Sequence, residues 1–116
     1  MTDLTKEHCR EYPPGTPPLD EQEAAELHQQ VPAWERDGTA RLRRTLRFED
    51  FKDAFGFATR IALVAEEEGH HPDMEIGWGK VVVALTTHSS GGLTRNDFIM
   101  AAKIDRLAAG LGLKQG

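Results

Sequence analysis

The chain has 116 residues, of which 39% are hydrophobic and 28% charged, and its net charge is −5. This length fits one domain with one modest core, and the acidic balance argues against a general nucleic-acid binder, which would be basic. Apolar runs such as Val81–Leu85 are far too short to cross a membrane, and the single cysteine, Cys9, excludes an internal disulfide. The start of the chain also lacks the apolar stretch of a signal peptide, so a cytoplasmic protein is expected.

Residues 1–18 are polar and carry four prolines between positions 13 and 18. Prolines at this density interrupt helices and sheet ladders, so we expect an irregular arm followed by a single domain over residues 19–116. His8 and Cys9 lie in this arm. Too few other ligands are nearby for a metal site, and no base or helix start activates the thiol. A surface histidine and a free thiol are therefore the simpler interpretation.

The first helix is predicted at Leu19–Gln30. Asp20 followed by Glu23 resembles a capping box, in which two residues satisfy each other's backbone donors. Pro32 ends the helix because it has no N–H to donate. The apolar positions recur at helical spacing and form one narrow face, made of Ala24, Leu27 and Val31.

Two strands, Ala33–Asp37 and Ala40–Phe48, are predicted on either side of Asp37-Gly38, a dipeptide typical of hairpin turns. The second strand alternates an apolar side with a basic stripe. The stripe could bind an anion, but a solvated face is the favoured interpretation because antiparallel sheets often leave one face wet. The apolar side holds Leu42, Leu46 and Phe48 with Arg44 among them, and the stripe holds Arg41, Arg43, Thr45 and Arg47.

The clearest helix is Asp50–Glu68, which ends at Gly69, a natural helix stop. Phe57 lies off its apolar stripe and is expected to contact a partner chain. Glu66–Glu68 places three negative charges at the helix C-terminus, where they oppose the helix dipole, and this hints that one of them is kept for another reason. The stripe predicted to pack on the sheet consists of Phe51, Ala54, Phe55, Ala58, Ile61, Ala62 and Ala65.

A second strand pair is predicted at Met74–Trp78 and Lys80–His88. The latter strand is apolar on both faces, which indicates a central position in the sheet. His88 lies at its end, where a strand can deliver a side chain to the rim of a pocket.

The last helix is predicted at Thr94–Leu111, with Thr94 and Asp97 in the pattern of a capping box. Phe98, Ala102 and Ala109 lie away from its main apolar stripe, which suggests an intersubunit contact. Together the elements predict an α+β fold: a four-stranded antiparallel sheet with three α-helices packed on one face.

Chemistry-bearing side chains gather in one stretch of 32 residues, from Glu66 to Asp97. It contains three histidines, each able to give or take a proton near neutral pH. Two carboxylates and an aromatic ring accompany them. Such a set suits a pocket for a planar, polar heterocycle that gains and loses protons. Its members are Glu66, His70, His71, Trp78, His88 and Asp97.

Other interpretations of the same residues remain open. Three histidines and a carboxylate could bind zinc, although adjacent histidines rarely converge on one tetrahedral ion and the helical spacing of two histidines four apart is missing. Any single histidine could be a hydrogen-bonded structural residue. Asp97 could serve only as the helix-capping acid, and Trp78 could be a core residue instead of a wall of the ligand site.

The spacing of this set resembles the signature of the pterin-4a-carbinolamine dehydratases. Residues 34–107 look like the rest of that family's domain, and Gly15–Leu19 is similar to its bacterial N-terminal segment. The signature runs as Glu66, three residues, His70-His71-Pro72, five residues, Trp78, nine residues, His88, eight residues and Asp97.

The resemblance implies dehydration of a 4a-hydroxytetrahydropterin to a quinonoid dihydropterin and water, which recycles the pterin. His70 and His71 would be the acid/base pair, and His88 would bind and polarise the pterin. Glu66 and Asp97 would orient imidazoles or hold the pterin's amino-pyrimidine edge. Trp78 and Thr87 complete the implied substrate site. The reaction is an elimination, so neither a metal nor a redox cofactor is expected, and the pterin is itself the substrate.

The implied partners are the pterin, a second copy or three more copies of the chain in a homodimer or homotetramer, and an aromatic amino-acid hydroxylase of the same pathway. No nucleic acid or membrane is expected. The alternative is a non-catalytic dimerisation or assembly scaffold with the same fold. That function would not need the histidines, so their presence with the carboxylates and Trp78 favours the enzyme.

Overall fold

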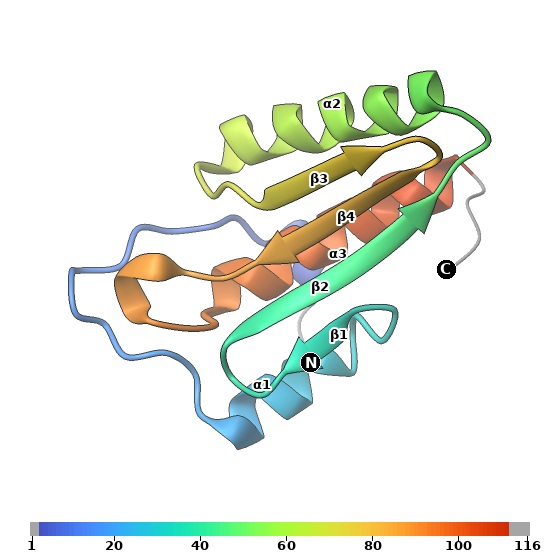
Figure 1. The fold of residues 1–116 in the computed structure, drawn as a ribbon. Coiled ribbons are helices and arrows are strands. Elements are labelled where there is room, and N and C mark those ends of the chain that lie inside the picture. Colours follow the sequence, from blue (N-terminus) through green and yellow to red (C-terminus); the bar gives the residue numbers. More distant parts are fainter. Residues whose placement is uncertain (1–2, 112–116) are drawn as a thin grey trace.

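The computed structural model describes residues 3–111. Four strands form one antiparallel sheet in the order β1-β2-β4-β3, and three α-helices cover one of its faces (Figure 1), which confirms the predicted α+β architecture. In chain order the elements are η1 (Leu4–Lys6), α1 (Glu21–His28), β1 (Glu35–Asp37), β2 (Arg41–Arg47), α2 (Phe51–Glu68), β3 (Asp73–Gly77), β4 (Lys80–Leu85), η2 (His88–Ser90) and α3 (Arg95–Gly110).

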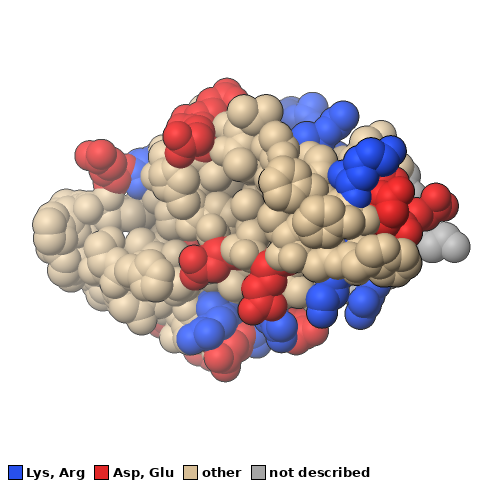
Figure 2. Space-filling view, turned by 45° about the horizontal axis from the view of Figure 1, so that its top comes forward, with Lys and Arg blue, Asp and Glu red and all other residues tan. Residues whose placement is uncertain are grey.

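The two central strands build the inner face of the sheet. In the β2–β4 pair, Leu42 lies opposite Leu85 and Leu46 opposite Val81, and all four side chains are fully buried under the helices. Side chains alternate between the faces of a strand, so the basic stripe lies on the helix-free side. Arg41, Arg43 and Arg47 are exposed there, as expected of a solvated face. Figure 2 shows basic and acidic side chains interspersed over one view of the surface.

Most of the stripe predicted to be buried on α2 is confirmed: Ala54, Ala58, Ile61 and Ala65 are buried, but Phe57 takes the place expected for Phe51 and Phe55. Phe57 is fully buried and its ring centroid lies 5.3 Å from that of Phe48, so the prediction that it contacts a partner chain is wrong. Phe51 and Phe55 are about half exposed and lie outside the core. The shared residues fit both arrangements, and the rotation of α2 against the sheet decides which aromatic side chains are buried beside them. The buried residues are Ala54, Phe57, Ala58, Ile61 and Ala65.

α3 is buried around most of its circumference because η1, α1, α2 and β4 all pack against it. Phe98 and Ala102, which were expected at an intersubunit contact, are buried within this chain. The reason is a long-range contact: η1 packs on α3, a pairing that the sequence pattern does not reveal. Leu4, in η1, is fully buried in the common core.

Three strands are shorter than predicted, and β2 (Arg41–Arg47) lacks only one residue at each end. β1 begins at Glu35 and not at Ala33, because Trp34 turns into the core and its Nε1 donates to Asp105 over 2.8 Å. β4 ends at Leu85 and not at His88. The chain leaves the ladder there and folds back through η2 towards the start of α3.

Both predicted capping boxes form. Asp20 and Glu23 cap α1, and Thr94 and Asp97 cap α3. No helix within residues 3–111 is long and apolar enough to cross a membrane.

Candidate functional site

The two adjacent histidines follow directly after α2. Gly69 ends that helix with a φ of 68°, a left-handed conformation that favours glycine. Pro72 favours an extended backbone before it, and neighbouring side chains of an extended segment diverge. His70 therefore reaches α3, while His71 reaches back to α2.

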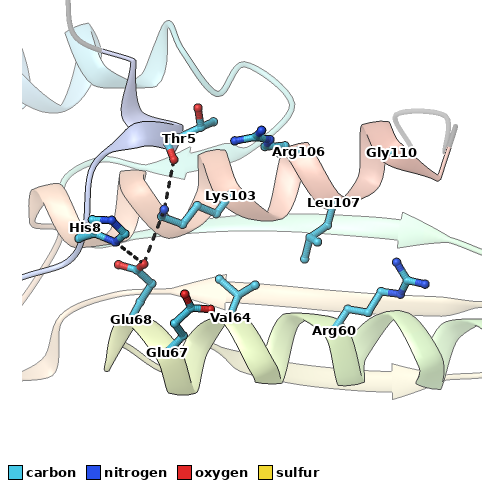
Figure 3. Close-up of a pocket in the computed structure, with 10 residues that line it drawn as sticks. All are labelled: Thr5, His8, Arg60, Val64, Glu67, Glu68, Lys103, Arg106, Leu107 and Gly110. Atoms are coloured by element: carbon cyan, nitrogen blue, oxygen red, sulfur yellow. Dashed lines mark hydrogen bonds and ion pairs between the residues drawn. The ribbon is translucent and has the colours of Figure 1, made fainter.

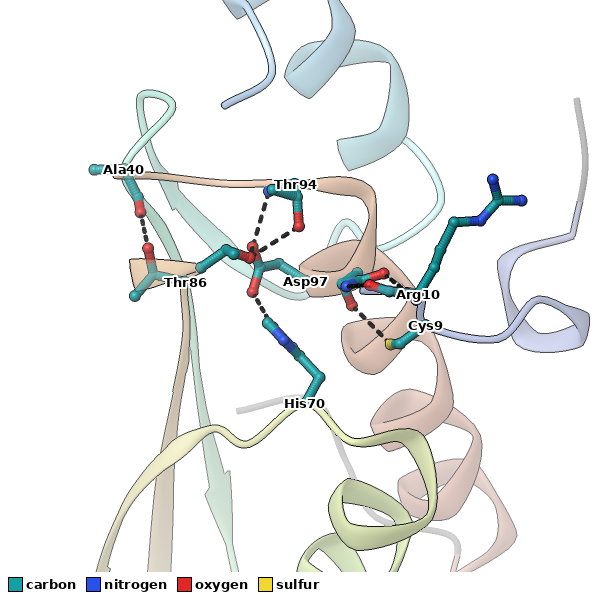
Figure 4. A network of polar contacts seen from close by, with 9 residues as sticks. Cys9, Arg10, Ala40, His70, Thr86, Thr94 and Asp97 are labelled. Atoms are coloured by element: carbon teal, nitrogen blue, oxygen red, sulfur yellow. Dashed lines mark hydrogen bonds and ion pairs between the residues drawn. The ribbon is translucent and has the colours of Figure 1, made fainter. Parts of the chain in front are cut away.

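His70 contacts a buried carboxylate. Its Nε2 lies 2.6 Å from Oδ1 of Asp97, and the Asp97 side chain is completely inaccessible to solvent. The other oxygen, Oδ2, accepts from the backbone N–H of Thr94 over 2.9 Å and from the hydroxyl of Thr87 over 2.8 Å. Figure 4 shows this network at the first turn of α3. One side chain thus caps the helix and holds the histidine, so the two roles weighed for Asp97 coexist.

The loop that carries Thr87 is fixed by close backbone contacts. Thr87 and Gly92 form an isolated bridge, and a Cβ at Gly92 would lie 2.6 Å from the carbonyl oxygen of Thr39. Only glycine fits such an approach without a shift of the backbone. The Thr87 hydroxyl is consequently held in the interior, where it contacts Asp97 and Thr94.

His71 forms a second imidazole–carboxylate pair, with Glu66 in the last turn of α2. Its surroundings differ from those of His70. The His71 and Glu66 side chains are 61% and 75% exposed, whereas the His70 side chain is 12% exposed. Solvent screens an exposed pair, so Asp97 holds its histidine more firmly than Glu66 does.

A cavity of about 580 Å³ lies beside this network. That volume is in the range of small-molecule sites. The predicted site residues Glu66, His70 and Thr87 line it. His88 follows Thr87 and precedes Ser89, which also lines the cavity, and its exposed imidazole has no hydrogen-bond partner among residues 3–111.

Trp78 lies apart from the other predicted site residues. It occupies the β3–β4 turn and is 75% exposed. The five residues of β3 carry the chain roughly 16 Å away from His71. Within one chain the indole is therefore not a wall of the cavity, and the prediction that it contacts substrate is left as a prediction.

Several residues that line the cavity carried no signal in the sequence. They come from the arm, which its prolines marked only as irregular, and from the residue before Asp97. No group of three or more His, Cys, Asp or Glu side chains suited to holding a metal ion occurs between residues 3 and 111. The unanticipated lining residues include Cys9, Arg10, Tyr12, Pro14 and Asn96.

Two titratable groups with shifted pKa values meet where the arm contacts the end of α2. Burial raises the pKa of the Cys9 thiol to about 12, and the neighbouring Glu68 carboxylate adds to the rise. The thiol is therefore neutral at physiological pH, as expected for a cysteine without a nucleophilic role. For Glu68, burial pushes the pKa up, but hydrogen bonds from Cys9 and His8 and the charge of Lys103 outweigh it, so the pKa is lowered overall.

The fold and the site define an α+β protein in which a histidine–carboxylate network borders a cavity at one end of the sheet. A family model described as Pterin 4 alpha carbinolamine dehydratase matches residues 17–107. The chain belongs to this family, whose name denotes a dehydratase, and the resemblance drawn from the signature spacing is confirmed.

Relatives and a solved structure agree with this assignment. A protein of Methylococcus capsulatus, provisionally named as a pterin-4-alpha-carbinolamine dehydratase, is 50% identical over 107 residues, or 91% of this chain and 94% of the relative. A protein of Gloeobacter violaceus with the same provisional name is 47% identical over 112 residues, which is 94% of this chain and 97% of the relative. The crystal structure of a transcriptional coactivator/pterin dehydratase from Brucella melitensis superposes with a TM-score of 0.73 at 38% identity and covers 78% of this chain and 98% of that one.

Proposed function

We propose that this chain dehydrates a 4a-hydroxytetrahydropterin by histidine acid/base catalysis. The observation that carries the proposal is the contact of His70 with the buried Asp97 beside a cavity of small-molecule size. A dehydratase must hold a proton-transfer group in a reproducible position against its substrate. Asp97 can hold the His70 imidazole in this way, because it is fully buried and is itself fixed by hydrogen bonds from Thr87 and Thr94. A scaffold has no need of this arrangement, so the site supports the enzyme over the scaffold.

We infer a role for each ring nitrogen of His70 from its contact with Asp97. An ionised carboxylate only accepts hydrogen bonds, so Nε2 carries the proton that faces Asp97. Nδ1 is then the nitrogen that acts on the substrate. The same reasoning applies to His71, whose Nε2 faces Glu66. In this proposal Asp97 and Glu66 are positioning residues that act through the two imidazoles.

The proposed reaction balances without any external electron donor or acceptor. One imidazole takes the proton from N5 of the pterin, and the electron pair of that N–H bond forms the N5=C4a double bond. The C4a–O bond breaks, and a protonated imidazole supplies the proton that lets the hydroxyl leave as water. Each such proton transfer typically contributes about 10²- to 10⁴-fold to the rate. His88, on the loop beside the cavity, would contact the bound pterin.

The proposed partners follow from the substrate. A hydroxylase that uses a tetrahydropterin would supply the carbinolamine, and the quinonoid product would return to the pterin pool. We propose an aromatic amino-acid hydroxylase as that supplier. Thr87 is buried and its hydroxyl is engaged with Asp97, so we propose that it acts through this carboxylate instead of touching substrate directly.

The test is a dehydration assay on a 4a-hydroxytetrahydropterin generated in situ by a phenylalanine hydroxylase and followed by ultraviolet absorbance. Wild type is compared with the double variant His70→Ala/His71→Ala. His28→Ala is the matched control, because His28 lies on α1 and contacts the carbonyl of Trp34. Circular dichroism verifies that each protein is folded. Wild type and the control should accelerate the reaction and the double variant should not. A folded wild type without activity would refute the proposal.

A further inference from the structure

The candidate cavity is lined by two parts of the chain that are far apart in the sequence. The family model begins at residue 17, yet the preceding arm contributes Cys9, Arg10, Glu11, Tyr12 and Pro14 to the cavity lining. The opposite side comes from the end of α2 and the loop after β4. A segment outside the matched domain therefore borders the group proposed to do the chemistry.

Two hydrogen bonds between the Asn96 side chain and the backbone of Arg10 hold the arm against α3. The Asn96 side chain accepts from the Arg10 N–H over 3.0 Å and donates to the Arg10 carbonyl over 2.7 Å. Asn96 is nearly inaccessible to solvent, and it directly precedes Asp97, which holds His70. Both residues lie in the first turn of α3, which begins at Arg95. The arm and the histidine are thus positioned by neighbouring residues of one rigid element.

A second anchor lies on α2. Glu68 accepts from the Cys9 N–H over 2.7 Å and contacts His8 Nδ1 at 2.9 Å. Lys103 approaches the same carboxylate at 3.6 Å and donates to the Thr5 carbonyl over 3.2 Å. Figure 3 shows Glu68 between His8 and Lys103. This explains why one acidic residue is kept at an unfavourable helix C-terminus: it fastens the arm.

Tyr12 is the one Phe, Tyr or Trp side chain among the described residues that line the cavity. Its ring is partly buried, and burial raises the pKa of its hydroxyl, so the side chain stays neutral. A planar heterocycle packs best against a flat aromatic surface. Trp78, which the sequence suggested for this role, lies at the far end of β3.

We propose that residues 8–14 of the arm form one wall of the substrate site and that the ring of Tyr12 packs against the bound heterocycle. This inference rests on the proposed function, because the heterocycle is taken to be a pterin. Tyr12 then determines substrate affinity, while Glu68 and Asn96 position the wall that carries it. The arm then contributes to substrate binding beside the residues of the family signature.

The experiment compares Tyr12→Leu, which removes the ring, with Tyr12→Phe, which keeps it. Dehydration kinetics give kcat and KM, and isothermal titration calorimetry gives the Kd of 7,8-dihydrobiopterin as an unreactive probe. Tyr12→Leu should raise KM and Kd about two- to tenfold, the usual worth of one aromatic contact, and leave kcat near the wild-type value. Tyr12→Phe should retain wild-type constants. Phe55→Leu, which changes an exposed aromatic on α2, is the matched control.

A second variant tests whether the arm contacts the substrate or only stabilises the fold. Glu68→Ala loosens the arm without touching Tyr12, so it should raise KM as Tyr12→Leu does. The two effects should be less than additive in the double variant, because both remove the same contact. Unchanged KM and Kd in Tyr12→Leu, with an active wild type, would overturn the arm proposal and leave the dehydratase standing. A wild type that neither converts nor binds a pterin would overturn both.

Discussion

Replacing Asp97 by Asn tests the central network with the smallest change of shape. The Asn carbonyl oxygen can still accept from Thr94 and Thr87, so the cap of α3 is retained. The amide NH₂ then replaces the oxygen that lies 2.6 Å from His70 Nε2. Two donors cannot face each other, so the ring proton of His70 must move to Nδ1, which is the nitrogen proposed to act on substrate.

The expected magnitudes follow from the contact that changes. A hydrogen bond to a charged carboxylate becomes one between two neutral groups, which lowers its contribution to folding from about 1.5–3 to about 0.5–1.5 kcal/mol. A general acid/base held in the wrong tautomer forfeits about 10²- to 10⁴-fold in kcat. The stability loss is a fraction of the total for a domain of this kind, roughly 5–15 kcal/mol, so Asp97→Asn should fold and yet turn over poorly.

The assay is the coupled dehydration of an in situ 4a-carbinolamine, with urea unfolding in parallel. Asp105→Asn is the matched control: it is the same substitution eight residues further along α3, where the carboxylate contacts Trp34 and Arg44 and not the cavity. The control should lose stability but retain kcat. A folded Asp97→Asn enzyme with a near-wild-type kcat would refute the reasoning about the tautomer.

Three further expectations concern the second histidine pair, the arm and the core. Glu66→Gln should lower kcat by less than Asp97→Asn, because the exposed Glu66 pair is screened by solvent; a larger loss in steady-state kinetics would reverse the ranking. Glu68→Gln should destabilise the protein by about 1–3 kcal/mol at neutral pH. The folded-state pKa of Glu68 is lowered, so this contribution is present above its ordinary range and is lost as the pH falls through the folded pKa; urea unfolding at neutral and acidic pH measures it, and a gap that widens in acid would contradict it. Phe57→Ala should cost about 3–5 kcal/mol, far more than Phe55→Ala on the exposed side of the same helix; equal costs by thermal unfolding would contradict the assigned rotation of α2.

Much of the fold could be predicted because its signals are local. The Asp37-Gly38 hairpin, the two capping boxes and the stop at Gly69 each depend on residues within a few positions of one another, and all were found in the structure. On α2 the sequence predicted the buried Ala54, Ala58, Ile61 and Ala65 but not which aromatic side chains accompany them. Only contact with the sheet decides that Phe57 is buried and Phe55 exposed.

The candidate site, like the fold, could be predicted only in part. The spacing of the signature residues identified the family and named His70, His71 and Asp97, because chemical type and order along the chain are properties of the sequence. The partner of each imidazole and the distance of Trp78 from the cavity depend on where α2, α3 and β3 lie. The role of the arm depends on contacts between residues 8–10 and residues 68 and 96, which are nearly 60 or more positions away. Such long-range contacts are created by packing and leave no periodic pattern, so the tertiary structure alone could bring the arm and Tyr12 to the cavity.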